Sequence, residues 1–179
     1  MVVTEPITEE TRLKQFDKYV MPHVPLDMRI WLECNGFFTQ AASTRFHGAY
    51  AGGLFDHSYR VMMNLMKLTG RLDLEWKRPE SPIIVGMFHD LCKIDQYKLE
   101  NGKYVWVRDT EIKGHGDKSA ILLSRLMQIT DEEFACVRYH MGAFSEKDEW
   151  QQYTDAIHEY PNVLWTHTAD MMASHLDGV

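Results

Sequence analysis

The segment over residues 82–88 constrains the fold most, because its side chains are apolar on every side of a helix. It reads PIIVGMF, and prolines at positions 79 and 82 stand where the first turn of a helix accepts them. A helix without a polar face belongs at the centre of a protein, covered by other elements. A strand of this length is the alternative, but the continuation HDLCK favours a helix. The sequence therefore predicts a central buried helix that ends in a histidine, an aspartate and a lysine.

Helical patterns dominate the rest of the chain. They cover residues 8–20, 25–34, 54–68, 115–129, 130–142 and 161–176. The segment from 130 begins with a capping box, Thr130 with Glu133, and is expected to stop at Gly142. Alternating residues flank Asn101-Gly102, which is typical of a type I′ hairpin turn. We therefore expect a mostly α fold of about six to eight helices with one short β-hairpin near residues 95–108.

The bulk composition fits one globular domain. The chain has 179 residues, of which 45% are hydrophobic, and this is enough for a sizeable core. No linker, repeat or low-complexity segment divides it. Residues 1–179 are therefore expected to form a single domain.

Several features predict a soluble, cytoplasmic protein without a membrane partner. No apolar run approaches the roughly 20 residues of a membrane span, and the N-terminus is acidic and polar, unlike a signal peptide. The three cysteines form no CxxC pair. The formal net charge is -7 without a long basic block, so strong nucleic-acid binding is not expected. A small phosphorylated substrate held through a metal remains compatible with this charge.

Histidines and aspartates at or near apolar-patterned positions form the main functional signal. They fall on five predicted helices or helix starts: His57, His89, Asp90, His115, His140 and Asp170. Buried polar groups need partners, and a single one is more often a satisfied core histidine or a helix cap. Several on different helices suggest a common partner. A divalent metal is such a partner, because it binds imidazole nitrogens and carboxylate oxygens together.

Helix geometry gives a reason for His89 and Asp90 to be adjacent in the sequence. Successive helix positions differ by about 100°, so both side chains can converge on one ion at the helix edge from two directions. A carboxylate also has two oxygens, which allows Asp90 to bridge two metals. The predicted central helix can therefore end in a metal site.

The ordered set of motifs resembles the HD-domain superfamily of metal-dependent phosphohydrolases. GGLFDHSYRV resembles the helix of the first histidine, MFHDLCKID resembles the HD helix with its trailing lysine, and THTADMMAS resembles the closing aspartate helix. Between them, GHGDKSA and RYHMG resemble the extra histidines of the subgroup with two metals. The resemblance covers about residues 45–175. It implies a helical bundle with this core. Residues 1–44, which lie outside the resemblance, are expected to pack on the core as helices.

The resemblance also implies a set of metal ligands. The first metal would be held by His57, His89, Asp90 and Asp170, and a second by His115 and His140 with Asp90 as the bridge. One departure is visible, because related proteins with two metals often have a His-His pair where this chain has His140-Met141. Occupancy by one metal, or a weaker second site, therefore stays open. Mn, Fe, Ni, Co or Zn suits several imidazoles, and Mn or Mg suits phosphate.

Four further residues have open roles. Lys93 matches the lysine that trails the HD pair, and it can hold a substrate phosphate, neutralise Asp90 or be solvated. His47 stands in the glycine-containing loop before His57 and is a candidate for substrate binding. Asp95 can support the site or only start the hairpin. His167 can support the site or only contribute to packing.

The expected function is hydrolysis of a phosphoester, as a phosphomonoesterase or phosphodiesterase, by a metal-activated water. The expected catalytic residues are Asp90, Lys93 and His115, and the substrate is expected to be a nucleotide or another small phosphorylated compound. Two alternatives remain: a di-iron oxygenase of the HD type and a non-catalytic binding module. Residues 1–44 are expected to cover the site or to form the contact of a homodimer.

Overall fold

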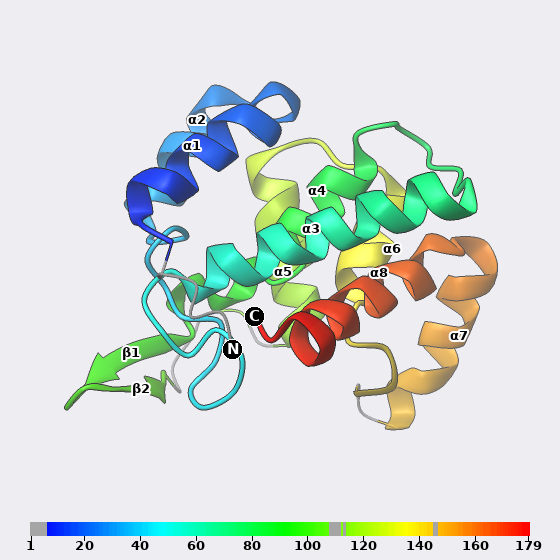
Figure 1. Cartoon of the computed structure of the whole chain (residues 1–179). Helices are drawn as coiled ribbons and strands as arrows, with labels where there is room; N and C mark the ends of the chain where they lie inside the picture. The colour runs from blue at the N-terminus through cyan, green and yellow to red at the C-terminus, as the bar shows by residue number, and fades with distance from the viewer. Residues whose placement is uncertain (1–6, 108–111, 113, 145–146) are drawn as a thin grey trace.

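The computed structural model describes residues 7–107, 112, 114–144 and 147–179 (Figure 1). Within them the chain forms eight α-helices and one two-stranded sheet. The helices are α1 Glu9–Tyr19, α2 Leu26–Cys34, α3 Gly53–Leu72, α4 Ser81–Phe88, α5 His115–Leu126, α6 Asp131–Arg138, α7 Trp150–Glu159 and α8 Asn162–Met171. A π-helical turn, Met172–Asp177, continues α8. The predicted mostly α fold is confirmed.

Helix α4 lies at the centre, as its apolar sequence predicts. Every residue of α4 except Ile83 is buried. It packs against α3, α6 and α8. Gly86 permits the contact with α3, because a Cβ at this position would collide with the Cα of Met62 in α3. The glycine within the apolar run therefore lets α3, which carries His57, approach α4, which leads directly into His89.

The first two helices cover one end of this core (Figure 1). The ring of Phe16 from α1 meets the rings of Phe38 and Phe88 edge-on, at centroid distances of 5.4 and 6.4 Å. All three side chains are fully buried or nearly so. The segment before residue 45 thus shares its apolar core with the end of α4.

Two helices end earlier than their sequences predict. The expected helix 130–142 begins with the predicted capping box of Thr130 and Glu133 but ends at Arg138, so His140 lies in the turn that follows. Helix α4 likewise ends at Phe88, and His89 and Asp90 form the turn before a 3₁₀ segment, Leu91–Asp95. In both cases a histidine ring binds a carbonyl of the last helical turn, as described below. The prediction of the end at Gly142 is therefore wrong.

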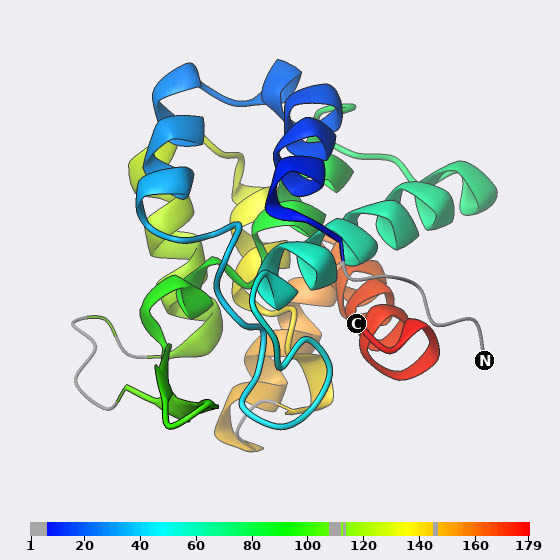
Figure 2. The same ribbon diagram turned by 60° about the vertical axis from the view of Figure 1, so that its left-hand side comes forward.

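The predicted hairpin is present. Strand β1, Tyr97–Glu100, pairs antiparallel with β2, Lys103–Trp106. Asn101 and Gly102 have φ of 50° and 75°, the two positive values that a type I′ turn requires. Residue 108 of the predicted range lies outside the described residues. Figure 2 shows the loop over residues 41–52 at the same end of the molecule as this hairpin, beside the start of α3.

Among the described residues, no helix is both long and apolar enough to cross a membrane.

Candidate metal centre

The structure brings together all six histidines and aspartates that the sequence singles out. Their ligand atoms form three overlapping groups, and within each group the atoms lie within 4.8 Å of one another. The groups are His57 with His89 and Asp90, His89 with His140 and Asp170, and Asp90 with His115 and His140. Five of the six residues are buried and His115 is half-buried. The turns after α4 and α6, the starts of α3 and α5, and the end of α8 thus meet at one point.

One side of the cluster is centred on the Nε2 atom of His57. This nitrogen lies 3.2 Å from His89 Nε2 and 3.2 Å from Asp170 Oδ1. It also lies 3.4 Å from Asp90 Oδ2. Two imidazole nitrogens and two carboxylate oxygens therefore face one another across a small space.

The other oxygen of Asp90 faces a second pair of histidines. Asp90 Oδ1 lies 2.7 Å from His115 Nε2 and 3.4 Å from His140 Nε2. Asp90 thus stands between two histidine pairs and turns one oxygen to each. This is the position that a carboxylate shared by two ions has to occupy.

Main-chain contacts aim the histidine rings. The Nδ1–H groups of His89 and His140 donate to the carbonyls of Gly86 and Val137, at 2.9 and 2.7 Å. A histidine that donates from Nδ1 in its neutral form keeps a free lone pair on Nε2. Each of these two residues therefore folds back on the helix that precedes it and presents Nε2 to the cluster.

Two buried atoms of the cluster lack hydrogen bonds. Among the described residues, Asp90 Oδ1 and His140 Nε2 are buried and have no hydrogen-bond partner. His115 Nε2 is close to the former but does not have hydrogen-bond geometry. Buried polar atoms are nearly always satisfied. A divalent transition metal would satisfy both, since its preferred donors include imidazole nitrogen and carboxylate oxygen. The residues present therefore fit such an ion.

Both aspartates are held in the ionised form that a metal needs. Burial by itself raises the pKa of Asp90, but Lys93, His89 and His115 lower it further than burial raises it, to well below its usual range. Burial also raises the pKa of Asp170, and the contact with His57 outweighs it, so this pKa is lowered too.

Lys93 is buried beside the cluster. Its Nζ lies 2.6 Å from Asp90 Oδ2, so the ammonium group neutralises part of the charge of the aspartate. Asp95 forms an ion pair with Lys118 of α5 and does not take part in the cluster contacts. Of the roles open to these two residues, Lys93 contacts the site and Asp95 joins the 3₁₀ segment to α5.

His47 lies against the cluster from the loop over residues 41–52. Its ring centroid is 5.0 Å from that of His57, and its Nε2 is 3.3 Å from Ser174 Oγ. Ser174 in turn donates to Asp170 Oδ1 at 3.3 Å. Ser174 was not predicted, although its position one turn after Asp170 places both on one helix face.

Two more residues support the histidines from behind. His167 Nδ1 contacts the main-chain oxygen of His140 at 2.9 Å, and its ring fills the space in which a Cβ on Gly142 would lie. Cys92 Sγ lies 3.0 Å from His115 Nδ1. His167 thus supports the turn that carries His140, and Cys92, whose role was not predicted, fixes the back of the His115 ring.

Comparison with known proteins agrees with this geometry. A family model described as HD domain matches residues 54–173, a range that includes all six clustered residues. No curated protein and no solved structure matches the chain. The matched range is more than half of the 179 residues. The chain therefore belongs to the HD domain family, within the superfamily of metal-dependent phosphohydrolases.

Proposed function

We propose that the protein hydrolyses a phosphoester of a nucleotide or related small phosphorylated compound. The observation that carries this proposal is the position of Asp90, whose two oxygens face two separate pairs of histidines. An arrangement of this kind supports binding of two divalent ions that share one carboxylate. Phosphoester hydrolysis is a reaction that uses such pairs of ions.

The proposed ligands divide into two sets that share one residue. The first set is His57, His89, Asp90 and Asp170, and the second is Asp90, His115 and His140. Manganese, iron, nickel, cobalt or zinc suits these donors, and magnesium suits the phosphate. Ions held here would supply activation of a water molecule and polarisation of the phosphoryl group.

The other residues of the site would bind and orient the substrate. Lys93 carries a buried positive charge beside Asp90, and this charge favours an anionic phosphate. Burial, helped by the positive neighbours His57 and Lys93, lowers the pKa of His47 to about 4. His47 is therefore neutral at pH 7 and can donate a hydrogen bond from its one N–H group to a phosphate oxygen.

Residues 1–44 are proposed to belong to the same domain as the HD core. The contact of Phe16 with Phe88 supports this, because Phe88 directly precedes His89. The N-terminal segment would then stabilise the end of α4, which is followed directly by two of the proposed ligands, His89 and Asp90.

The test is release of phosphate or of the alcohol product from a panel of nucleotides and bis(p-nitrophenyl) phosphate, with Mn²⁺. Wild type should react, Asp90→Ala should not, and His158→Ala should match wild type because His158 is exposed. A fully active Asp90→Ala protein would contradict the proposal. Failure of metal-loaded wild type on every compound, with dioxygen uptake by the iron-loaded protein, would instead support the oxygenase.

A further inference from the structure

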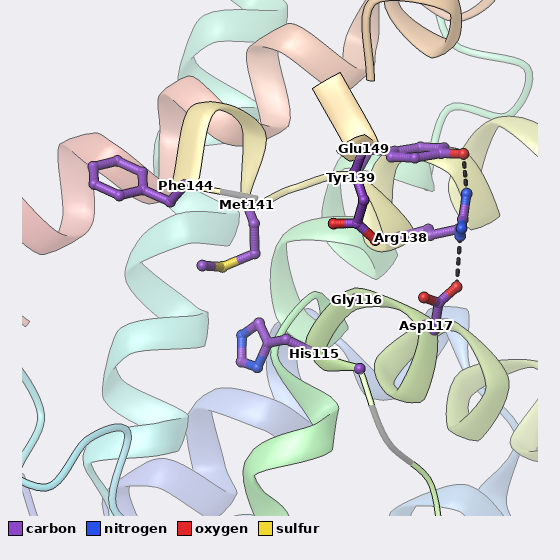
Figure 3. Close-up of a pocket in the computed structure, with 9 residues that line it drawn as sticks. His115, Gly116, Asp117, Arg138, Tyr139, Met141, Phe144 and Glu149 are labelled. Atoms are coloured by element: carbon purple, nitrogen blue, oxygen red, sulfur yellow. Dashed lines mark hydrogen bonds and ion pairs between the residues drawn. The ribbon is translucent and has the colours of Figure 1, made fainter. Parts of the chain in front are cut away.

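A cavity of about 290 Å³ opens beside His115, next to the metal centre (Figure 3). Its volume is close to the lower end of small-molecule sites, about 300–1,000 Å³. One wall is the start of α5, and the other is the chain after α6. The side chains that matter for recognition are His115, Asp117, Arg138, Met141, Phe144 and Glu149.

Part of the lining is apolar and accessible. Met141 is half-buried, and Phe144 is 65% exposed although it is a large apolar side chain. Figure 3 shows both on the side of the cavity where His115 lies. A thioether and a phenyl ring beside an imidazole form a surface suited to a flat ring system.

The positive charge of the cavity is already committed. Arg138 Nε donates to Asp117 Oδ1 at 2.5 Å, and its Nη1 contacts the hydroxyl of Tyr139. The Nη1 and Nη2 atoms of Arg138 also donate to Gln152 Oε1, each at 3.4 Å. The pair of Arg138 and Asp117 is therefore internally neutral and leaves little charge for a ligand.

The remaining charge is negative. The side chain of Glu149 forms no hydrogen bond or ion pair with any residue in the described part of the chain, and the residue is only half-buried. Figure 3 shows its carboxylate directed into the space between Met141 and the start of α5. A ligand that fills the cavity thus meets a carboxylate that can only accept hydrogen bonds.

We propose that this cavity binds the base of a nucleotide through an edge that carries N–H donors. The proposal rests on the proposed hydrolase function, which puts the phosphate at the metal centre. Glu149 would repel a phosphate group and attract N–H donors, so the orientation of the substrate is set: phosphate toward Asp90 and Lys93, base toward Glu149.

The donor pattern ranks the bases. Guanine has two adjacent donors, N1–H and the amino group, that fit one carboxylate. Adenine and cytosine have one amino group beside an acceptor nitrogen. Uracil has one N–H group between two carbonyl groups. The oxygens of these carbonyls are repelled by the oxygens of a carboxylate. We therefore expect guanine to bind best and uracil worst, with affinities that differ by about tenfold. This difference is within the range of discrimination that a bidentate contact provides.

The test compares binding of guanosine, adenosine and uridine 5′-monophosphates by equilibrium dialysis. Metal-free wild-type protein serves as the host, because it keeps Asp90 and Lys93 and binding is then read without hydrolysis. Adding Glu149→Gln should remove the preference for guanosine over uridine monophosphate. Adding Glu75→Gln should keep it, since Glu75 is exposed in the segment after α3. Adding Phe144→Ala should weaken all three nucleotides alike.

Two results would overturn the proposal: equal affinity of the metal-free wild-type host for the three nucleotides, or a preference that survives Glu149→Gln. These outcomes are distinct from failure of the hydrolase proposal. Base-selective binding with no phosphate release by metal-loaded wild type would remove the reaction and keep the cavity assignment. Phosphate release with no base preference in binding would do the reverse.

Discussion

Arg12 and Asp56 form a buried bidentate ion pair that joins the N-terminal helix to the residue directly before His57. Arg12 Nε and Nη2 donate to the two oxygens of Asp56 at 2.8 and 2.9 Å, and both side chains are 5% exposed. The Tyr50 hydroxyl donates to the same carboxylate at 3.1 Å. The guanidinium also occupies the space where a Cβ on Gly52 would lie. One contact thus fixes α1, the loop that carries His47 and the start of α3.

Replacing Arg12 by alanine should destabilise the protein strongly. The change leaves Asp56 buried without its cation, which typically costs about 3–5 kcal/mol. Urea denaturation measures the free energy of unfolding. Lys14→Ala is the matched control, because Lys14 is also in a salt bridge but its side chain is 74% exposed, and its loss should change stability by about 0.5 kcal/mol or less. Equal effects of the two substitutions would contradict the role given to the Arg12–Asp56 pair.

A methyl group on Gly86 should damage both stability and the metal centre. The new Cβ collides with Met62 and pushes α3 and α4 apart, at a cost of about 1–3 kcal/mol for overpacking. Because these helices carry His57 and lead into His89, metal affinity should fall as well. Both quantities can be followed by denaturation and by metal titration of Gly86→Ala.

The control for Gly86 is Gly70→Ala. Gly70 lies in α3 with no atom within 4 Å of the added Cβ, so this change should be neutral or stabilising by up to about 1 kcal/mol. If Gly86→Ala behaves like Gly70→Ala, the close approach of the two helices is not a requirement of the site.

The stability of the metal-free protein should fall at high pH because of His57. Burial by itself lowers the pKa of His57, but contacts with Asp170 and Asp90 raise it to about 9, above the 6.5 of an unperturbed histidine. The protonated form therefore stabilises the fold fully below about pH 6.5, and this contribution is lost as the pH rises through about 9.

Denaturation of metal-free protein at pH 6.5 and 9.5 measures this loss. The difference in unfolding free energy between the two pH values should shrink in His57→Gln and persist in His158→Gln. A wild-type difference that His57→Gln leaves untouched would show that other groups cause it. Since a histidine binds a metal only in its neutral form, metal affinity should rise over the same pH range.

Replacing His115 by alanine should remove one metal ion and leave the other. His115 faces Asp90 Oδ1, whereas His57 faces Oδ2 and Asp170, so the two sides of the cluster depend on different histidines. Metal analysis after dialysis should give about one ion fewer for His115→Ala than for wild type. The same number of ions in both proteins would place His115 outside the metal ligands.

The sequence predicted the features that local chemistry encodes. Asn101-Gly102 requires positive φ at both turn positions, and Thr130 with Glu133 forms its capping box within one helical turn. Local pattern was sufficient for the turn and the cap. The six clustered residues were predicted because they stand at or near apolar-patterned positions and because the order of their motifs along the chain resembles that of a known family.

Other features depend on tertiary contacts that no local pattern contains. Arg12 and Asp56 are 44 residues apart, and nothing near either residue indicates the other. Helix α6 ends at Arg138 because the His140 ring takes the carbonyl of Val137, a competition that helical periodicity does not register. The cavity at Glu149 likewise exists only once the chain after α6 has folded against the start of α5.

The central claim is that Asp90 holds metal ions between two histidine pairs. The most direct test is the metal content of wild type and Asp90→Asn after saturation with Mn²⁺ and dialysis, with folding of both checked by circular dichroism. Asparagine keeps the shape of the side chain but removes its charge and one of the two oxygens. We predict two ions on wild type and none retained on folded Asp90→Asn. A folded Asp90→Asn protein that retains the same ions as wild type would contradict the account.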